Sequence, residues 1–133
     1  MIFLDTSLII AYKIDNDQNH ETALKIMAKI SEGHFGNTVI SDYIFDESLT
    51  VALAKTRELK AAVEIGEELM TIQIIKIDNA IIHEAWQIFK SQKGTKFSFT
   101  DCTCMALMEK FNIRNIATFD SDFKKIKEIN VVQ

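Results

Sequence analysis

The sequence predicts an α/β fold in which a parallel sheet is covered by helices on both faces. Short apolar runs of strand length, such as those at 2–4 and 116–119, alternate with longer segments of helical periodicity. These runs do not alternate with polar residues, which is typical of strands that are buried on both sides. The chain has 133 residues with no proline and no internal linker, so we expect one domain over residues 1–133.

The first half of the chain is expected to contain two strands and four helices. Gly33 marks the end of the second helix, because glycine readily takes the left-handed conformation that follows many helices. Ser41 suits the N-cap of the third helix, and Asp42 then lies in its first turn. The expected elements are a strand at 2–4, helices at about 6–12 and 18–32, a strand at 38–40, and helices at about 41–55 and 58–71.

The second half continues the alternation of helices and strands. The β-branched segment 72–77 is compatible with either a strand or an extended connection. Ile82, Trp86 and Phe89 share one stripe of the next helix, and we expect Trp86, like Phe111 further on, to lie in the core. The remaining elements are helices at about 79–92 and 98–112 around a loop at 93–97, a strand at 115–118, a short helix near 121–127 and a strand at 131–132.

Composition and charge exclude several classes of protein. Fifteen Lys and Arg against nineteen Asp and Glu give a formal net charge of −4, which does not by itself indicate a nucleic-acid partner. No apolar run approaches the ~18 residues of a membrane span, and no charged leader precedes the first strand. Cys102 and Cys104 lie two residues apart on a helix and point away from each other, so we expect reduced thiols and a cytoplasmic protein.

Four acids fall where the predicted sheet ends its strands or begins the helices that follow. Asp5 and Asp120 each follow an apolar run, Asp101 opens a helix, and Glu47 lies in the first turns of another. The carboxyl ends of parallel strands share one edge of a sheet, and ligands bind in the crevice there. Carboxylates gathered without a cation would repel one another, so this arrangement predicts a bound metal ion.

Each acid also has a simpler structural explanation when it is considered alone. Asp5 precedes Thr6 and Ser7, and all three residues suit the start of a helix. Asp101 would be stabilised at the positive end of its helix, with Ser98 as the cap. Four separate caps that all fall at one edge of the sheet are the less economical explanation.

Two further choices stay open at this point. Glu47 lies on a partly apolar stripe, but most helical glutamates are solvated, and periodicity does not choose between Glu47 and its neighbour Asp46. Asp120 and Asp122 lie two apart in a turn, where one acid can cap the short helix while the other binds a cation.

This ordered set of motifs resembles the PIN domain and, within it, the VapC-type toxin ribonucleases. The resemblance implies a three-layer α/β/α sandwich with a central parallel sheet. It also selects Glu47 rather than Asp46, and Asp122 matches an extra acid of some members. The matching pieces are Ile2-Phe3-Leu4-Asp5-Thr6-Ser7, the helix with Glu47, Phe97-Ser98-Phe99-Thr100-Asp101, and Ala117-Thr118-Phe119-Asp120-Ser121-Asp122-Phe123.

The resemblance further implies an activity, a cofactor and partners. The activity would be Mg²⁺- or Mn²⁺-dependent cleavage of RNA, with a homodimer as the assembly and a small antitoxin protein as the partner. The catalytic and metal-binding residues would be Asp5, Glu47, Asp101 and Asp120, with Asp122 as an additional metal ligand.

Other functions are compatible with the same residues. One is a PIN-like nuclease of RNA processing that has no antitoxin, and another is a non-catalytic module that binds RNA or protein. A phosphatase that uses Asp5 as the phosphate acceptor is less suitable, because Ser7 stands where such an enzyme would have its second Asp.

Overall fold

The computed structural model describes all residues from Met1 to Gln133 and has a parallel five-stranded sheet at its centre. The strand order is β3-β2-β1-β4-β5, so the first strand occupies the middle position. All residues of β1 are buried, which agrees with an apolar run that is covered on both sides. The strands are β1 (Ile2–Leu4), β2 (Thr38–Ser41), β3 (Gln73–Ile75), β4 (Asn115–Ala117) and β5 (Asn130–Val132).

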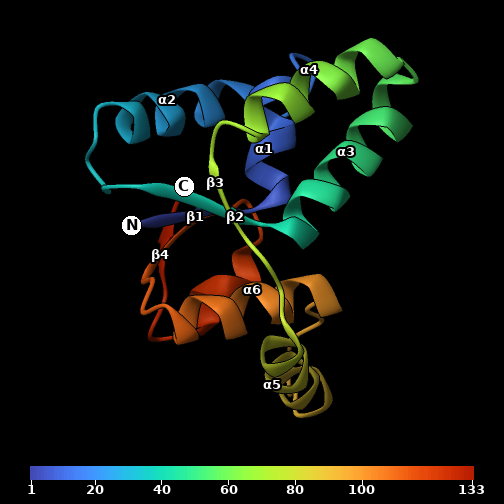
Figure 1. Cartoon of the computed structure of the whole chain (residues 1–133). Coiled ribbons are helices and arrows are strands. Elements are labelled where there is room, and N and C mark those ends of the chain that lie inside the picture. The colour runs from blue at the N-terminus through green and yellow to red at the C-terminus, as the bar shows by residue number, and fades with distance from the viewer.

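Helices cover both faces of this sheet and form an α/β/α sandwich (Figure 1). Four helices, α1 to α4, lie on one face, while α6 lies on the other face and α5 packs on the outer side of α6. The predicted three-layer architecture is therefore confirmed. The helices are α1 (Thr6–Lys13), α2 (His20–Ser31), α3 (Asp42–Thr56), α4 (Leu59–Leu69), α5 (Asn79–Lys90) and α6 (Phe99–Lys110), with a 3₁₀ turn η1 at Ser121–Lys125.

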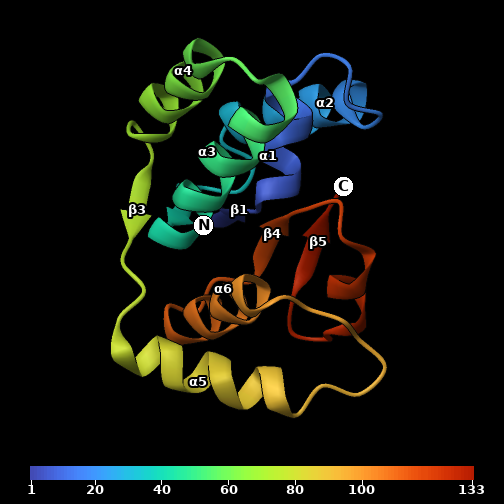
Figure 2. The same cartoon turned by 90° about the vertical axis from the view of Figure 1, so that its right-hand side faces the viewer.

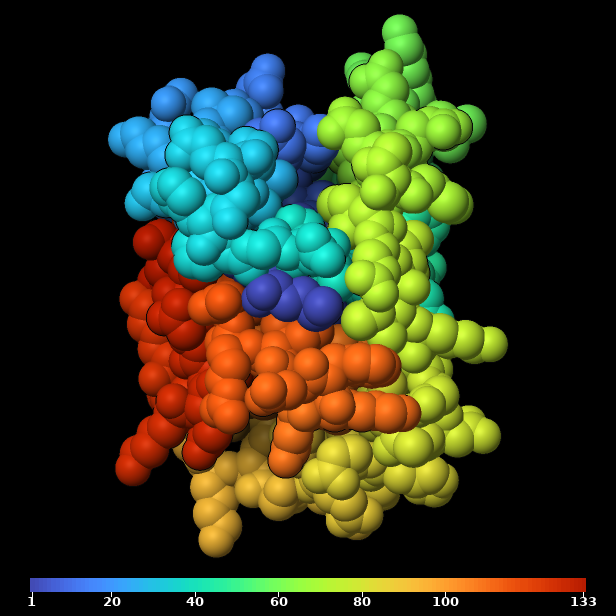
Figure 3. Space-filling view, turned by 60° about the vertical axis from the view of Figure 1, so that its left-hand side comes forward, coloured from blue at the N-terminus to red at the C-terminus, as the bar shows by residue number.

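The segment at 72–77, which the sequence left open, contains the short edge strand β3. It pairs in parallel with β2, with Ile40 opposite Ile74. The chain then runs down the edge of the sheet and links the upper helical layer to the lower one (Figure 3). None of the helices is both long enough and apolar enough to span a bilayer.

The predicted helix caps are also found in the structure. The Ser41 hydroxyl accepts a hydrogen bond from the Ile44 N–H at 3.1 Å and caps α3. Ser98 caps α6 in a reciprocal capping box with Asp101. Gly33, just beyond α2, has a φ of +82°, which is favourable for glycine.

The predicted burial of Trp86 and Phe111 is wrong, because these side chains are 48% and 46% exposed. The reason is that α5 packs on α6 rather than on the sheet, and it buries only a narrow stripe that includes Ile81 and Ala85. Trp86 lies beside that stripe, and Phe111 follows the last residue of α6. Apolar periodicity does not reveal how wide a stripe the neighbouring layer will cover.

Candidate metal centre

A cleft of about 370 Å³ lies at the carboxyl ends of the central strands. Leu4 of β1 is opposite Ala117 of β4, so Asp5 and Thr118 emerge side by side from the sheet. Figure 2 faces this edge of the sheet, where α1 follows β1 and α3 follows β2. The cleft is lined by Asp5, Thr6, Ser7, Ile10, Asp17, Asn19, Glu47, Val51, Lys55, Ser98, Asp101 and Asp120. The structure therefore brings all four predicted acids to one cavity.

Asp5 is the most buried of these acids, with 4% of its surface exposed. Its Oδ2 accepts hydrogen bonds from the Ser7 hydroxyl at 2.6 Å and the Thr118 hydroxyl at 2.7 Å. The same oxygen accepts a longer bond of 3.4 Å from the Ser7 N–H, which caps α1. Asp5 thus caps α1 and also lines the cleft. Its Oδ1 accepts no hydrogen bond from the chain.

Two hydroxyl groups fix the end of β1 against the end of β4. Ser7 Oγ accepts the Phe119 N–H at 2.9 Å, and Thr118 Oγ1 accepts the Asp120 N–H at 3.0 Å. Because both hydroxyls also donate to Asp5, the position of Asp120 is tied to that of Asp5 through Thr118. This network holds two of the four carboxylates in a fixed relation.

Replacing Thr118 by valine is expected to lower the free energy of unfolding by about 1–3 kcal/mol. The isosteric side chain keeps the packing but removes the donor to Asp5 and leaves the Asp120 N–H without its acceptor. Urea denaturation of the variant would measure the loss, with the exposed Thr50→Val as the matched control. Equal stability of the two variants would contradict a structural role for the Thr118 hydroxyl.

Asp101 lies in the first turn of α6 and lines the cleft. Its Oδ2 accepts the Ser98 N–H at 2.8 Å, while its own N–H donates to the Ser98 hydroxyl at 3.1 Å. Burial, together with the charges of Asp5 and Asp120, raises the pKa of Asp101 from 3.8 to about 6. The repulsion that the sequence predicted is therefore present in the folded chain.

The raised pKa of Asp101 gives an expected pH dependence. The folded state holds the proton of the Asp101 carboxyl group more tightly than the unfolded chain does. The protonated Asp101 therefore adds its full contribution to the free energy of unfolding below about pH 4, and this contribution is lost as the pH rises through about 6. The loss is at most about 3 kcal/mol, and less where solvent screens the charge.

The pH dependence can be measured by urea unfolding of the metal-free protein between pH 4 and pH 8. Subtracting the curve of Asp101→Asn, which does not titrate at this position, isolates the contribution of Asp101. Parallel curves for the two proteins would show that the Asp101 carboxyl group is not perturbed.

Asp120 and Asp122 have different roles in the structure. Asp120 lines the cleft, and its Oδ1 accepts the Asp122 N–H at 2.9 Å at the start of η1. Asp122 does not line the cleft; its Oδ1 forms an ion pair with Lys125 at 2.6 Å. The hydrogen bond from Lys125 lowers the pKa of Asp122. The geometry thus favours Asp120 over Asp122 as a ligand of the cleft.

Of the two neighbouring acids Glu47 and Asp46, only Glu47 lines the cleft. Glu47 is half-buried and lines the cleft, whereas Asp46 is exposed and does not. Glu47, Val51 and Lys55 are spaced by four along α3, and all three line the cleft.

Three polar residues of the cleft were missed by the sequence reasoning: Asp17, Asn19 and Lys55. Asp17 and Asn19 belong to the connection between α1 and α2, where the Asp17 carboxylate accepts the Asn19 N–H at 2.8 Å. No periodicity applies to such a loop, so its position was not predictable. Lys55 could have been found, because it continues the spacing of four from Glu47 and Val51.

The carboxylates of the cleft are suited to a hard divalent cation. Asp5, Glu47, Asp101 and Asp120 form no ion pair with any Lys, Arg or His of the chain. Asp5, Asp101 and Asp120 each use only one oxygen for hydrogen bonds within the chain, which leaves the other oxygen free. In addition, the buried hydroxyl of Thr6 in the cleft wall has no hydrogen-bond partner.

These side chains do not yet form a coordination shell of three or more ligands. A cation would require the free carboxylate oxygens to turn toward one another, and water would complete its shell. Mg²⁺ commonly binds in this way, through one or two carboxylates and several waters. The donor chemistry of the cleft therefore fits Mg²⁺ or Mn²⁺.

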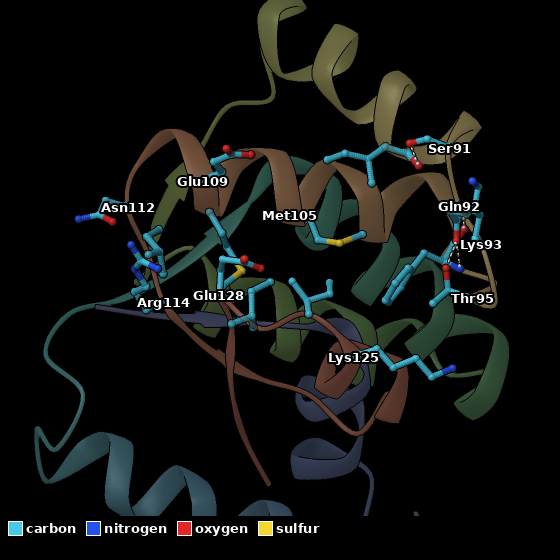
Figure 4. A pocket seen from close by; sticks show the side chains of 16 residues that line it. Ser91, Gln92, Lys93, Thr95, Met105, Glu109, Asn112, Arg114, Lys125 and Glu128 are labelled. Atoms are coloured by element: carbon cyan, nitrogen blue, oxygen red, sulfur yellow. Dashed lines mark hydrogen bonds between the residues drawn. The ribbon is translucent and has the colours of Figure 1, made fainter.

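A second cavity, of about 660 Å³, contains none of these four acids. It lies along α6, with Gln92 and Thr95 at one end and Arg114 at the other (Figure 4). Gln92 fixes this end by accepting the Phe97 N–H at 2.7 Å and donating to the Phe97 carbonyl at 3.0 Å. The floor is formed by apolar side chains such as Met105, so the cavity lacks the carboxylate set of the smaller cleft.

Comparison with known proteins agrees with the fold and the cleft. The family model of the PIN domain matches residues 2–129. The VapC ribonuclease of Archaeoglobus fulgidus is 26% identical over 121 residues, which are 90% of this chain and 77% of that protein. The 23S rRNA-specific endonuclease VapC20 of Mycobacterium tuberculosis is 28% identical over 92% of both chains.

Solved structures of two related proteins have the same fold as this chain. The crystal structure of M. tuberculosis VapC20, described as a toxin that cleaves the sarcin-ricin loop, superimposes with a TM-score of 0.85 at 26% identity over 96% of this chain and 95% of that one. A toxin-antitoxin complex from Klebsiella pneumoniae shares the fold at 18% identity, with a TM-score of 0.68 over 100% of this chain and 97% of that one. The chain therefore belongs to the PIN-domain family and is homologous to its VapC-type ribonucleases.

Proposed function

We propose that this protein is a Mg²⁺- or Mn²⁺-dependent endoribonuclease and the toxin of a toxin-antitoxin pair. The observation that carries the proposal is the set of four carboxylates, from four separate elements, that line one cleft without an ion-pair partner. A purely structural set of caps would not need to converge in this way. The names of the homologous VapC proteins, which are a ribonuclease and an endonuclease, support the choice of RNA as substrate.

In this proposal Asp5, Asp101 and Asp120 hold the cation through their free oxygens. A bound Mg²⁺ or Mn²⁺ supplies a more acidic ligand water and stabilises negative charge on the phosphodiester. Glu47, which reaches the cleft from α3, either shares in holding the cation or accepts the proton of the attacking water. Ser7 and Thr118 keep Asp5 oriented through their hydrogen bonds to its Oδ2.

The partners of the protein follow from the same relationship. A small antitoxin protein is the proposed binding partner, because several structural neighbours come from toxin-antitoxin complexes. A homodimer is the proposed assembly. Both cysteines are free and buried, which agrees with a reducing compartment such as the cytoplasm.

Lys55 is expected to contact the phosphate backbone of the substrate. It is the only cationic side chain that lines the cleft, and it forms no ion pair with the acids around it. Lys55→Gln should therefore raise KM by several-fold at low salt, with a smaller effect at high salt because screening weakens phosphate contacts.

Steady-state cleavage of a labelled RNA at two salt concentrations would test this prediction. Lys29→Gln, an exposed lysine of α2 that does not line the cleft, is the matched control. A salt-independent loss of kcat with an unchanged KM would assign Lys55 to another step.

The proposed function is tested by incubating the full chain with mixed cellular RNAs and Mn²⁺ or Mg²⁺, with and without a chelator. We expect discrete RNA fragments that require the metal and that Asp101→Asn does not produce. Cleavage that continues in excess chelator, or in the Asp101→Asn protein, would reject the metal-dependent mechanism. Tight RNA binding without cleavage under any condition would instead indicate a non-catalytic module.

A further inference from the structure

Three aromatic side chains form a continuous row along α5 and the start of α6, where Trp86 and Phe89 are exposed and Phe99 is partly buried. The rings of Trp86 and Phe89 are stacked, with their centroids 6.0 Å apart and an interplanar angle of 16°. Phe89 in turn meets Phe99 edge-on, also at 6.0 Å. Trp86 is 48% exposed and Phe89 is 38% exposed. We call Trp86, Phe89 and Phe99 the aromatic ledge.

The aromatic ledge ends beside the cleft that holds the acids. Phe99 is the first residue of α6 and directly follows Ser98, which lines the cleft. Asp101 lies two residues further along the same helix. Figure 2 shows α5, which carries the other two residues of the ledge, running along the outer side of α6.

The surroundings of the ledge are polar and partly cationic. The Lys90 ammonium lies over the Trp86 ring, 5.6 Å from its centroid. Lys93 and Lys96 follow in the exposed loop between α5 and α6, and none of these three lysines forms an ion pair. These three lysines therefore lie in the part of the chain that connects Phe89 of the ledge with Ser98 of the cleft.

A protein partner is less suited to this surface than a nucleic acid. His83, Glu84 and Gln87, which are exposed polar residues, neighbour Trp86 on α5, so polar side chains interrupt the exposed apolar surface of this helix. The fully buried core of a stable protein interface is apolar and depleted of charge over several hundred Å². Aromatic rings with lysines beside them match a nucleic-acid strand, which carries both bases and phosphates.

We propose that the aromatic ledge binds unpaired bases of the RNA substrate by stacking, while Lys90, Lys93 and Lys96 contact its phosphates. The proposal rests on the ribonuclease function and adds a surface outside the cleft that binds unpaired bases of the substrate next to the cut site. A base-paired duplex keeps its bases stacked on each other and offers no unpaired bases to this surface. The ledge binds the RNA on one side of the cut site and takes no part in the chemistry.

Trp86 provides a direct test because it is the only tryptophan of the chain. Its fluorescence would be recorded while an unlabelled single-stranded RNA of mixed sequence is added to the full chain in excess chelator, which prevents cleavage. We expect saturable quenching by the single strand and little change with the matched duplex. Affinity would be measured in parallel by the anisotropy of the same RNA carrying a fluorescent label.

Variants separate stacking from general loss of structure. Trp86→Ala is expected to weaken binding of the single strand about fivefold or more. Trp86→Phe, which keeps a stacking ring, should restore most of the affinity. The matched control is Phe111→Ala, because Phe111 is also exposed and also has a lysine, Lys110, over its ring at 5.9 Å, but lies at the opposite end of α6. Its variant should bind RNA as the wild type does.

Two outcomes would overturn the proposal while the ribonuclease function stands. One is metal-dependent cleavage by Trp86→Ala with an unchanged KM and unchanged RNA affinity. The other is a fall in the oligomeric state of Trp86→Ala in sedimentation, with its RNA affinity unchanged and with wild-type fluorescence that does not respond to the single strand. This result would assign the ledge to contact between copies of the chain. If the wild-type protein neither binds nor cleaves RNA, the proposed function itself fails and the ledge proposal with it.

Discussion

Asp101→Asn is expected to reduce RNA cleavage by about 100-fold or more while leaving the fold intact. The substitution removes one negative charge from a cleft in which Asp5 and Asp120 already raise the pKa of Asp101. The amide oxygen of asparagine can still accept the Ser98 N–H, so the capping box of α6 retains this bond. The loss of activity would therefore reflect the lost carboxylate ligand rather than unfolding.

The measurement is the initial rate of cleavage of a labelled RNA at saturating Mn²⁺, with circular dichroism to confirm the fold. Asp122→Asn is the matched control, since Asp122 is a nearby acid that pairs with Lys125 and does not line the cleft. It should keep most of the activity. A fully active Asp101→Asn protein, or equal losses in both variants, would contradict the roles assigned to the two acids.

Mg²⁺ or Mn²⁺ is expected to raise the melting temperature by about 2–5 °C once its concentration is about tenfold above Kd. The cation binds the folded cleft, where the acids already lie together, and binds the unfolded chain poorly because the same acids are then far apart. It also offsets the repulsion from Asp5 and Asp120, which adds to the effect of burial in raising the pKa of Asp101. The increase should be larger at pH 8 than at pH 5, because protons compete with the metal for the carboxylates.

Thermal melts over a metal titration at constant ionic strength would measure this increase. NaCl at matched ionic strength is the control for general screening, and Asp101→Asn should lose most of the metal-dependent increase. No increase up to millimolar Mg²⁺ and Mn²⁺ in the wild-type protein would count heavily against a cation in the cleft.

The fold was predictable because its determinants are local or nearly so. The apolar run at 2–4 is too short for a helix and lacks polar alternation, and Ser41 and Ser98 are strong caps, so the strand and helix positions agree with the structure. Burial on the outer layer was less predictable. Whether Trp86 is covered depends on what packs against α5, and nothing within the helix itself encodes this.

The candidate site was predictable where topology alone determines position. Asp5 and Asp120 follow neighbouring parallel strands, so their proximity follows from the sheet. The choice of Glu47 over Asp46 came from the resemblance to the family, since the rotation of α3 about its axis depends on its packing. Asp17 and Asn19 reach the cleft from a loop whose path is fixed only by tertiary contacts.

The most direct test of the proposed cation site is a crystal structure from crystals grown with Mn²⁺, with data collected at a wavelength where manganese scatters anomalously. We predict an anomalous peak in the cleft, within bonding distance of the Asp5 and Asp101 carboxylates and close to Asp120. An occupied manganese site elsewhere on the molecule, with the cleft filled only by ordinary water at saturating Mn²⁺, would contradict the claim that these acids converge to hold a cation.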